Sequence, residues 1–272
     1  MGGCCSSLPG LDDPEVGKPH TFKIKKSQAS PDSRNFEVYN TDGEHWLVIK
    51  SDSDLSDPTP NFSLINKERE HVLGKCEIGV ENVVCAKDVD WDGSDDSKSS
   101  DDSKDSMFDF DESELKVKLR WKIKRSAKFS DEDGREFATV GLQMKGLSKC
   151  EVEVDEEDNK DNDEDWDATA KVKNVSYTLS IDGKDYDVSV EKGNWDNWDR
   201  KWKVDGMFDV EYKQNDGADE VTVKTTDLEG NPGHDLLIAF AISEFMHPCR
   251  QLTKLNQAAV QIGKNAMMEH RN

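Results

Sequence analysis

The sequence lacks the features that define several large classes of protein. No apolar run approaches the roughly 20 residues that a membrane-spanning helix needs, and no apolar stretch typical of a secretory signal follows the N-terminus. The six cysteines include no CxxC pair and no Cys/His spacing of the kind that binds zinc. These absences predict reduced thiols and a cytosolic environment for the chain.

Catalytic signatures are missing as well. The chain contains no GxSxG, HExxH or GxGxxG motif and no P-loop, and its six histidines are dispersed. We therefore expect a protein that is not an enzyme and that needs no organic cofactor.

Charge is abundant but unevenly distributed. The 272 residues include 36 Lys and Arg against 58 Asp and Glu, which gives a formal net charge of −22. The window 88–114 holds 12 acids and 2 lysines, and the window 151–167 holds 11 acids and 1 lysine, so the two carry −20 of the −22. We predict that both windows are acidic disordered inserts in a nearly neutral protein. The net charge disfavours nucleic acid as a partner, whereas the inserts suit a basic protein partner.

The most specific motif is the N-terminal MGGCCSS. Removal of Met1 exposes Gly2, with Ser6 at the position that N-myristoylation prefers. One myristoyl chain anchors a protein only marginally, so stable attachment needs a second signal. The next charged residues are acidic, which excludes a polybasic patch, but S-palmitoylation of Cys4 and Cys5 supplies that signal. We predict a lipoprotein acylated with myristate and palmitate at Gly2, Cys4 and Cys5, held at the cytosolic face of the plasma membrane.

The remaining pattern predicts a mostly β protein. Residues 1–20 are proline-rich and are predicted to form a tether. From Thr21 onward, apolar and polar residues alternate, and turn signals at 41–43, 133–134 and 182–183 separate about ten to twelve short strands. The clearest strand is Leu115–Arg125, and later strands are predicted at 137–144, 150–154, 172–181, 186–190, 202–204, 208–212 and 221–225.

Helix is predicted only near the end of the chain. Residues 235–246 read DLLIAFAISEFM, which is apolar on nearly all faces and therefore has to be surrounded by protein. At about 1.5 Å per residue this helix is too short to cross a bilayer. An amphipathic helix is predicted at 249–269, with Leu255, Ala259 and Ile262 on its apolar face.

Three segments resemble one known superfamily: FEVYNTDGEHWLVIKSD (36–52), NFSLINKEREHVLGK (61–75) and DLLIAFAISEF (235–245). They are similar to the tubby-like superfamily, especially the plant LURP-one-related proteins, with the phospholipid scramblases as relatives. The resemblance covers roughly 21–247. It implies a closed antiparallel barrel of about twelve strands (21–248) around a central hydrophobic helix. The acidic inserts and the extra helix at 249–272 depart from the family pattern. The alternative fold is a β-sandwich with a helix packed outside it.

A row of cations on the strand 115–125 is the first candidate site. Its members share one face and lie about 6.6–7 Å apart: Lys116, Lys118, Arg120, Lys122 and Lys124. Tubby-like proteins bind phosphoinositide headgroups through Lys and Arg on strands, so the resemblance implies lipid-headgroup binding here. The alternative is that Glu151, Glu153 and Asp155 on a nearby strand pair with the row and stabilise the sheet.

A second candidate site is a short acidic motif. Asp88, Asp90 and Asp92, followed by Gly93, match the first ligands and the turn glycine of a calcium-binding loop. The twelfth position is Ser99 where such loops have Glu, and the Ser/Asp-rich continuation is typical of a solvated acidic loop. Calcium binding by these three residues is one hypothesis, and a solvated loop is the other.

These observations predict a membrane-anchored, tubby-like module without enzymatic activity. It would bind lipid headgroups or protein partners, in signalling or defence if the plant resemblance holds. The alternative is a scramblase-like or calcium-responsive membrane-associated protein.

The acylation hypothesis has a direct test. Gly2→Ala removes the myristate acceptor, and palmitoylation of Cys4 and Cys5 depends on prior membrane contact, so the protein should move from the membrane to the soluble fraction. Fractionation of cells expressing the two forms measures this shift. Membrane attachment of Gly2→Ala equal to the unaltered chain would show that the paired cysteines are incidental.

Overall fold

The computed structural model describes residues 12–26, 35–52, 60–79, 82–90, 114–153, 165–191, 200–215, 218–226, 229–244, 246, 255–262 and 264–265. For 82–90, 114–119, 149–153, 165–168, 170, 214–215 and 218–219 it describes the backbone only. Gly2, Cys4, Cys5 and Asp92 lie outside the described residues, as do most of the two acidic windows.

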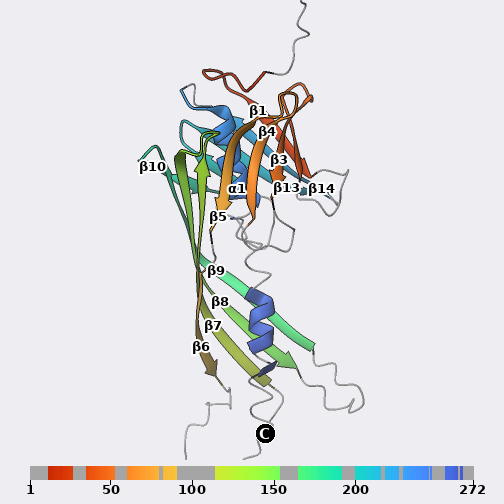
Figure 1. Ribbon diagram of the computed structural model, residues 1–272. Helices are drawn as coiled ribbons and strands as arrows, with labels where there is room; N and C mark the ends of the chain where they lie inside the picture. The colour runs from red at the N-terminus through yellow and green to blue at the C-terminus, as the bar shows by residue number, and fades with distance from the viewer. Residues whose placement is uncertain are drawn as a thin grey trace, which may run out of the picture. The chain divides into compact units, whose positions relative to one another are not determined.

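The described chain folds into antiparallel strands, as the alternating pattern predicts (Figure 1). The strands are β1 (Thr21–Lys26), β2 (Phe36–Tyr39), β3 (His45–Ser51), β4 (Asn61–Asn66), β5 (Val72–Ile78), β6 (Asn82–Asp90), β7 (Glu114–Ser130), β8 (Glu136–Glu153), β9 (Asp165–Ile181), β10 (Lys184–Tyr186), β11 (Val188–Val190), β12 (Arg200–Val204), β13 (Phe208–Asn215) and β14 (Ala218–Thr225). The helix α1 (Pro232–Glu244) follows them, and residues 255–262 and 264–265 are also helical.

Thirteen of the strands form a nearly closed antiparallel barrel, in the order β10-β9-β8-β7-β5-β4-β3-β2-β1-β14-β13-β12-β11. β6 lies off this path and pairs with β7. The segment predicted as one strand, 186–190, is divided. Tyr186 pairs with Leu179 of β9, whereas Val188 pairs with Val204 of β12, so the chain changes partner between them. Periodicity cannot show such a change, because alternation continues through it.

Residues with positive φ form the turns of two hairpins. Gly134 has φ of +81° and its N–H donates to the carbonyl of Asp131 at 3.1 Å, which closes the β7–β8 turn. At the β9–β10 turn, Asp182 and Gly183 both have positive φ, 48° and 78°. Gly and Asp tolerate this left-handed backbone, so these turns were visible in the sequence.

Parts of both acidic windows form β-strands. β6 extends to Asp90 and β7 begins at Glu114, so both ends of the window 88–114 belong to paired strands. Likewise β8 extends to Glu153 and β9 begins at Asp165. Backbone hydrogen bonds between neighbouring strands do not require apolar side chains, so the ladders continue into acidic sequence that composition alone assigned to disordered inserts.

α1 begins three residues before the predicted start at Asp235. The side-chain oxygen of Asn231 accepts a hydrogen bond from the N–H of Gly233 at 2.9 Å, as an N-cap residue does. Pro232 occupies the first helical position, where its missing N–H costs nothing. Because of this cap, the helix includes Pro232 and Gly233, which the sequence prediction placed outside it.

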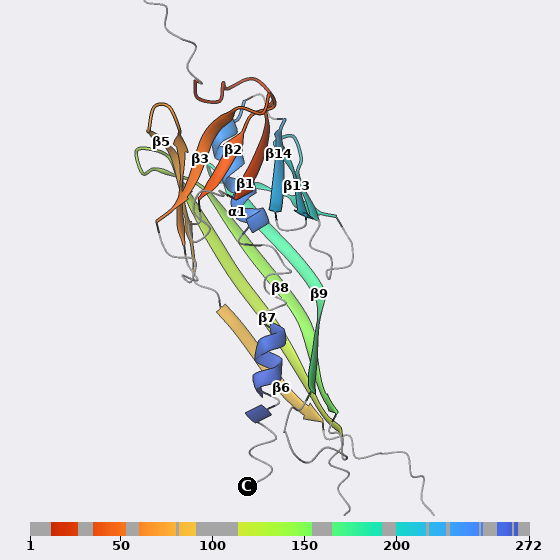
Figure 2. The same ribbon diagram turned by 90° about the vertical axis from the view of Figure 1, so that its right-hand side faces the viewer.

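α1 is buried on nearly every side. Every residue except His234 is buried, and Leu236 to Ile242 are fully inaccessible to solvent. The Phe240 ring packs edge-on against Phe36 of β2 at 4.8 Å and Phe62 of β4 at 5.7 Å between centroids. α1 also contacts β5, β13 and β14, and Figure 2 shows it among these strands.

The start of α1 lies close to β5 and β8. A Cβ at Gly74 of β5 would touch the Leu237 side chain at 3.4 Å, so the strand backbone packs directly on the helix. The His234 ring stacks on Phe137 of β8 at 3.8 Å, and burial lowers the pKa of this histidine. His234 is therefore favoured in its neutral form, which suits an imidazole lying on a phenyl ring.

The described chain divides into two compact units. The first comprises 1–82, 124–143 and 176–249, and the second comprises 83–123, 144–175 and 250–272, so β7, β8 and β9 each contribute to both. In the second unit, 255–262 and 264–265 are helical within the predicted range 249–269. Leu255 and Ala259 are buried there, whereas Gln257 and Gln261 are exposed, which is the predicted amphipathic pattern.

Part of the predicted tether is held on the barrel. The indole N–H of Trp46 donates to the carbonyl of Asp12 at 2.6 Å. The Asp13 carboxylate contacts three side chains from the end of β4 and the start of β5: Asn66 at 2.6 Å, Arg69 at 3.6 Å and His71 at 3.2 Å. Pro14 is buried beside them. We call residues 12–14 with these partners the N-terminal clamp.

The packing around α1 predicts a large effect of core truncation. Phe240→Ala leaves a cavity between Phe36 and Phe62, so it should lower the free energy of unfolding by about 3–5 kcal/mol. Val16→Ala is the matched control, because Val16 is 56% exposed and should change stability by less than about 0.5 kcal/mol. Urea denaturation measures both. If Phe240→Ala and Val16→Ala lowered the free energy of unfolding by the same small amount, α1 would not occupy a packed core.

Candidate functional site

The predicted cation row lies on β7. Trp121, Ile123 and Arg125 are buried on one face of this strand, whereas Arg120 and Lys124 are exposed on the other face and Lys122 is half-buried there. The backbone of Lys116 and Lys118 continues the strand, but their side chains lie outside the described set. The alternation of the sequence therefore places at least three cations on the outer face of β7.

Contacts on the buried face fix this orientation. The indole N–H of Trp121 donates to the Ser148 hydroxyl on β8 at 3.1 Å, and its ring lies where a Cβ at Gly146 would be. Only glycine lets the indole approach the neighbouring strand so closely. Because Trp121 is locked inward, its sequence neighbours Arg120 and Lys122 are directed outward.

Sequence reasoning missed Lys145, which joins these cations. It is exposed on β8, between the buried residues Met144 and Gly146, so it lies on the outer face that Arg120 and Lys122 share. The predicted strand ended at Met144 because Gly146 and Ser148 are not apolar. Their burial continues the period of two, which was the available signal. Arg120, Lys122 and Lys145, all in the second unit, form what we call the outer cation cluster.

The first unit contains a hollow on the outer face of β7, β8 and β9. It encloses about 320 Å³. Its lining residues are Lys124, Arg125, Ser126, Gly141, Leu142, Gln143, Ser176 and Thr178. Gly141 provides the space, because a Cβ at this position would lie 2.5 Å from the Thr178 hydroxyl oxygen. The Ser176 hydroxyl donates to the backbone carbonyl of Gln143 at 3.5 Å. We call this feature the Gly141 hollow.

The chemistry of the Gly141 hollow suits an anion. Its lining residues include a lysine, an arginine, three residues with hydroxyl groups and a glutamine, and no Asp or Glu. A lysine ammonium serves as a point charge for phosphate, and hydroxyl groups donate to phosphate oxygens.

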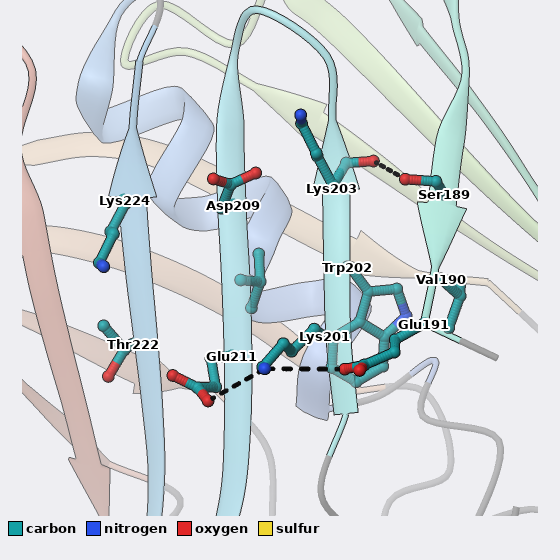
Figure 3. A pocket seen from close by; sticks show the side chains of 11 residues that line it. Ser189, Val190, Glu191, Lys201, Trp202, Lys203, Asp209, Glu211, Thr222 and Lys224 are labelled. Atoms are coloured by element: carbon teal, nitrogen blue, oxygen red, sulfur yellow. Dashed lines mark hydrogen bonds and ion pairs between the residues drawn. The ribbon is translucent and has the colours of Figure 1, made fainter. Parts of the chain in front are cut away.

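A larger groove on β11 to β14 has the opposite character (Figure 3). It encloses about 510 Å³, and lysines and carboxylates alternate along it. Lys201 lies between Glu191 at 3.8 Å and Glu211 at 3.9 Å. Hydrogen bonding to Asp205 raises the pKa of Lys203. Because these lysines already have carboxylate neighbours, the groove is less suited to a free anion than the Gly141 hollow is.

The acidic motif is only partly described. Asp88 and Asp90 belong to β6, with backbone described and side chains not. Across the described ranges, no group of three or more His, Cys, Asp and Glu side chains is placed to hold a metal ion. Calcium binding by Asp88, Asp90 and Asp92 therefore stays a prediction. The pairing of Glu151 and Glu153 with the cation row is also still a prediction. Both glutamates lie on β8, the neighbour of β7.

The remaining cysteine chemistry is simple in the part that the structure describes. Cys76 on β5 is a free, buried thiol, and burial raises its pKa strongly. It is therefore protonated at neutral pH and behaves as a small core residue. None of the described helices is long and apolar enough to span a bilayer.

No family model matches the chain, and neither does any curated protein or solved structure. The similarity to tubby-like and LURP-one-related proteins therefore stays a prediction from the three sequence segments.

The close approach at Gly141 can be tested by a paired substitution. Gly141→Ala should cost about 1–3 kcal/mol of stability, because its Cβ meets the stiff β-branched Thr178. Adding Thr178→Ala should restore most of that loss, whereas adding Thr178→Val should not, since valine keeps an atom at the hydroxyl position. Thermal and urea unfolding of the single and double variants measure this. Equal recovery with alanine and valine would contradict the contact.

Proposed function

We propose that this protein is a non-enzymatic, lipid-anchored module of the tubby-like kind that binds anionic phospholipid headgroups. The proposal rests mainly on the outer face of β7 and β8. There Arg120 and Lys145, which are exposed, and Lys122, which is half-buried, lie in one unit, and the carboxylate-free Gly141 hollow lies in the other. Each unit by itself presents a feature suited to phosphate.

The proposed barrel is closed around α1. A helix that is apolar on every side needs cover on every side, and the described neighbours of α1 come from β2, β4, β5, β13 and β14. In this arrangement the helix fills the interior, so ligands have access only to the outside of the strands. This favours a headgroup site on the outer face over one in a central cavity.

Acylation would supply most of the membrane affinity. Each Lys or Arg near an anionic membrane surface contributes about 1 kcal/mol, so the outer cation cluster gives about 3 kcal/mol. That energy is too small for stable attachment alone. Joined to acyl chains on Gly2, Cys4 and Cys5, it would determine which face of the protein meets the bilayer.

The net charge of −22 does not prevent this contact. Charges are screened over about 8 Å at physiological ionic strength. Most of the excess acid belongs to the windows 88–114 and 151–167. Acids that lie more than a screening length from a basic face on β7 and β8 therefore contribute little to its contact with an anionic surface.

The test uses the full chain with Gly2→Ala, so that acyl chains do not dominate binding. Sedimentation with liposomes containing phosphatidylserine or a phosphoinositide should exceed sedimentation with phosphatidylcholine alone. Reversing the outer cation cluster (Arg120→Glu, Lys122→Glu and Lys145→Glu) should lower binding by at least about 100-fold, since three favourable charges become repulsive.

The matched control reverses three lysines of the groove on β12 and β14: Lys201→Glu, Lys203→Glu and Lys224→Glu. It changes the net charge equally and should retain most of the binding. Equal losses in both triple variants would mean that net charge alone controls the interaction. Binding unchanged by reversal of the outer cation cluster would refute the proposed site.

A further inference from the structure

The border of the second unit is an unusually long strand. β9 is 17 residues long, and β10 covers only Leu179 to Ile181 on the side away from β8. From Asp165 to Thr178, no other described strand pairs with that side. Figures 1 and 2 both show this part of β9 at the border of the sheet formed with β6, β7 and β8.

A free strand edge is a template for another strand, because its N–H and C=O groups lack ladder partners. Edges are usually protected by proline, by a bulge, by short length or by charged side chains, lysine above all. β9 contains no proline or glycine. Thr169, Lys171 and Lys173 are exposed along it. Its length suits pairing with a second strand, and its exposed lysines restrict the partner to a strand that places acids opposite them.

The edge sequence is complementary to itself in one arrangement. In an antiparallel pair of β9 strands centred on Thr169, Asp165 stands opposite Lys173 and Asp167 opposite Lys171 of the second copy. By symmetry this gives four pairs of opposite charge. Directly opposed unlike charges stabilise a sheet, whereas a parallel in-register pair would oppose like charges at all four positions.

The acidic window 151–167 favours the same arrangement. It carries 11 acids against 1 lysine and enters β9 from its N-terminal end. In the antiparallel pair, the Asp165 residues of the two copies lie about 27 Å apart at 3.4 Å per residue. This exceeds the screening length of about 8 Å. A parallel pair would bring both windows together.

We propose that the free edge of β9 is a self-association surface, through which two copies pair as antiparallel strands about a two-fold axis at Thr169. The four-stranded sheet of β6 to β9 then becomes a continuous eight-stranded sheet. A single strand pair buries less surface than a standard protein interface, so the association is weak in solution. Confinement to a membrane would strengthen it by raising the local concentration. This inference does not depend on headgroup binding.

The test is sedimentation velocity on the full chain with Gly2→Ala over a wide range of concentration. The unaltered edge should give species approaching twice the chain mass of 30.7 kDa at high concentration. Lys171→Glu with Lys173→Glu should be monomeric, because acids then oppose Asp165 and Asp167. Asp165→Lys with Asp167→Lys should also be monomeric, because lysines then oppose lysines.

An equimolar mixture of the two charge variants separates edge pairing from misfolding. Each variant alone repels its own copy, but together they restore all four pairs of opposite charge, so the dimer should reappear. Lys128→Glu with Lys184→Glu, which changes the charge equally on other exposed lysines, should dimerise like the unaltered chain. A monomeric parent at every concentration, or a mixture that stays monomeric, would overturn the proposal.

Discussion

The burial of α1 is the constraint on which the rest of the first unit depends. A helix with seven consecutive fully buried residues, Leu236 to Ile242, cannot lie on a surface. Strands distant in sequence contact it, and inward residues such as Phe36 and Phe62 pack on its Phe240 ring. The polar residues of α1 lie at its ends, where Asp235 and Glu244 are buried and interact with other groups.

The sequence predicted the positions of individual strands better than the contacts between them. Alternation in 115–125 located β7 and the outward direction of Arg120 and Lys124, because strand geometry alone determines which face a residue occupies. The buried strand positions of Gly146 and Ser148 were missed, since small residues carry no apolar signal. The start of α1 depended on the cap by Asn231. Each of these errors arose where a backbone hydrogen bond or close packing outweighed hydrophobic pattern.

The candidate site was predictable only in part, for a related reason. The cation row lies on one strand and follows from its sequence. The Gly141 hollow requires Lys124, Gln143 and Thr178 to be brought together from three strands, and periodicity does not encode the register between strands. Lys145 joined the outer cation cluster because Trp121 packs on Gly146, a contact between neighbouring strands. Features that depend on register became visible only with the fold.

The N-terminal clamp has a mechanical consequence. β1 lies in the middle of the sheet, hydrogen-bonded to β2 on one side and to β14 on the other. Tension applied to the start of the chain reaches the contacts of Asp12 and Asp13 before it reaches β1, because these residues are fastened to Trp46, Asn66 and His71. A few polar contacts can break and re-form while the two ladders of β1 stay intact. Under such tension the clamp contacts would break first, and the two ladders of β1 would carry load only afterwards.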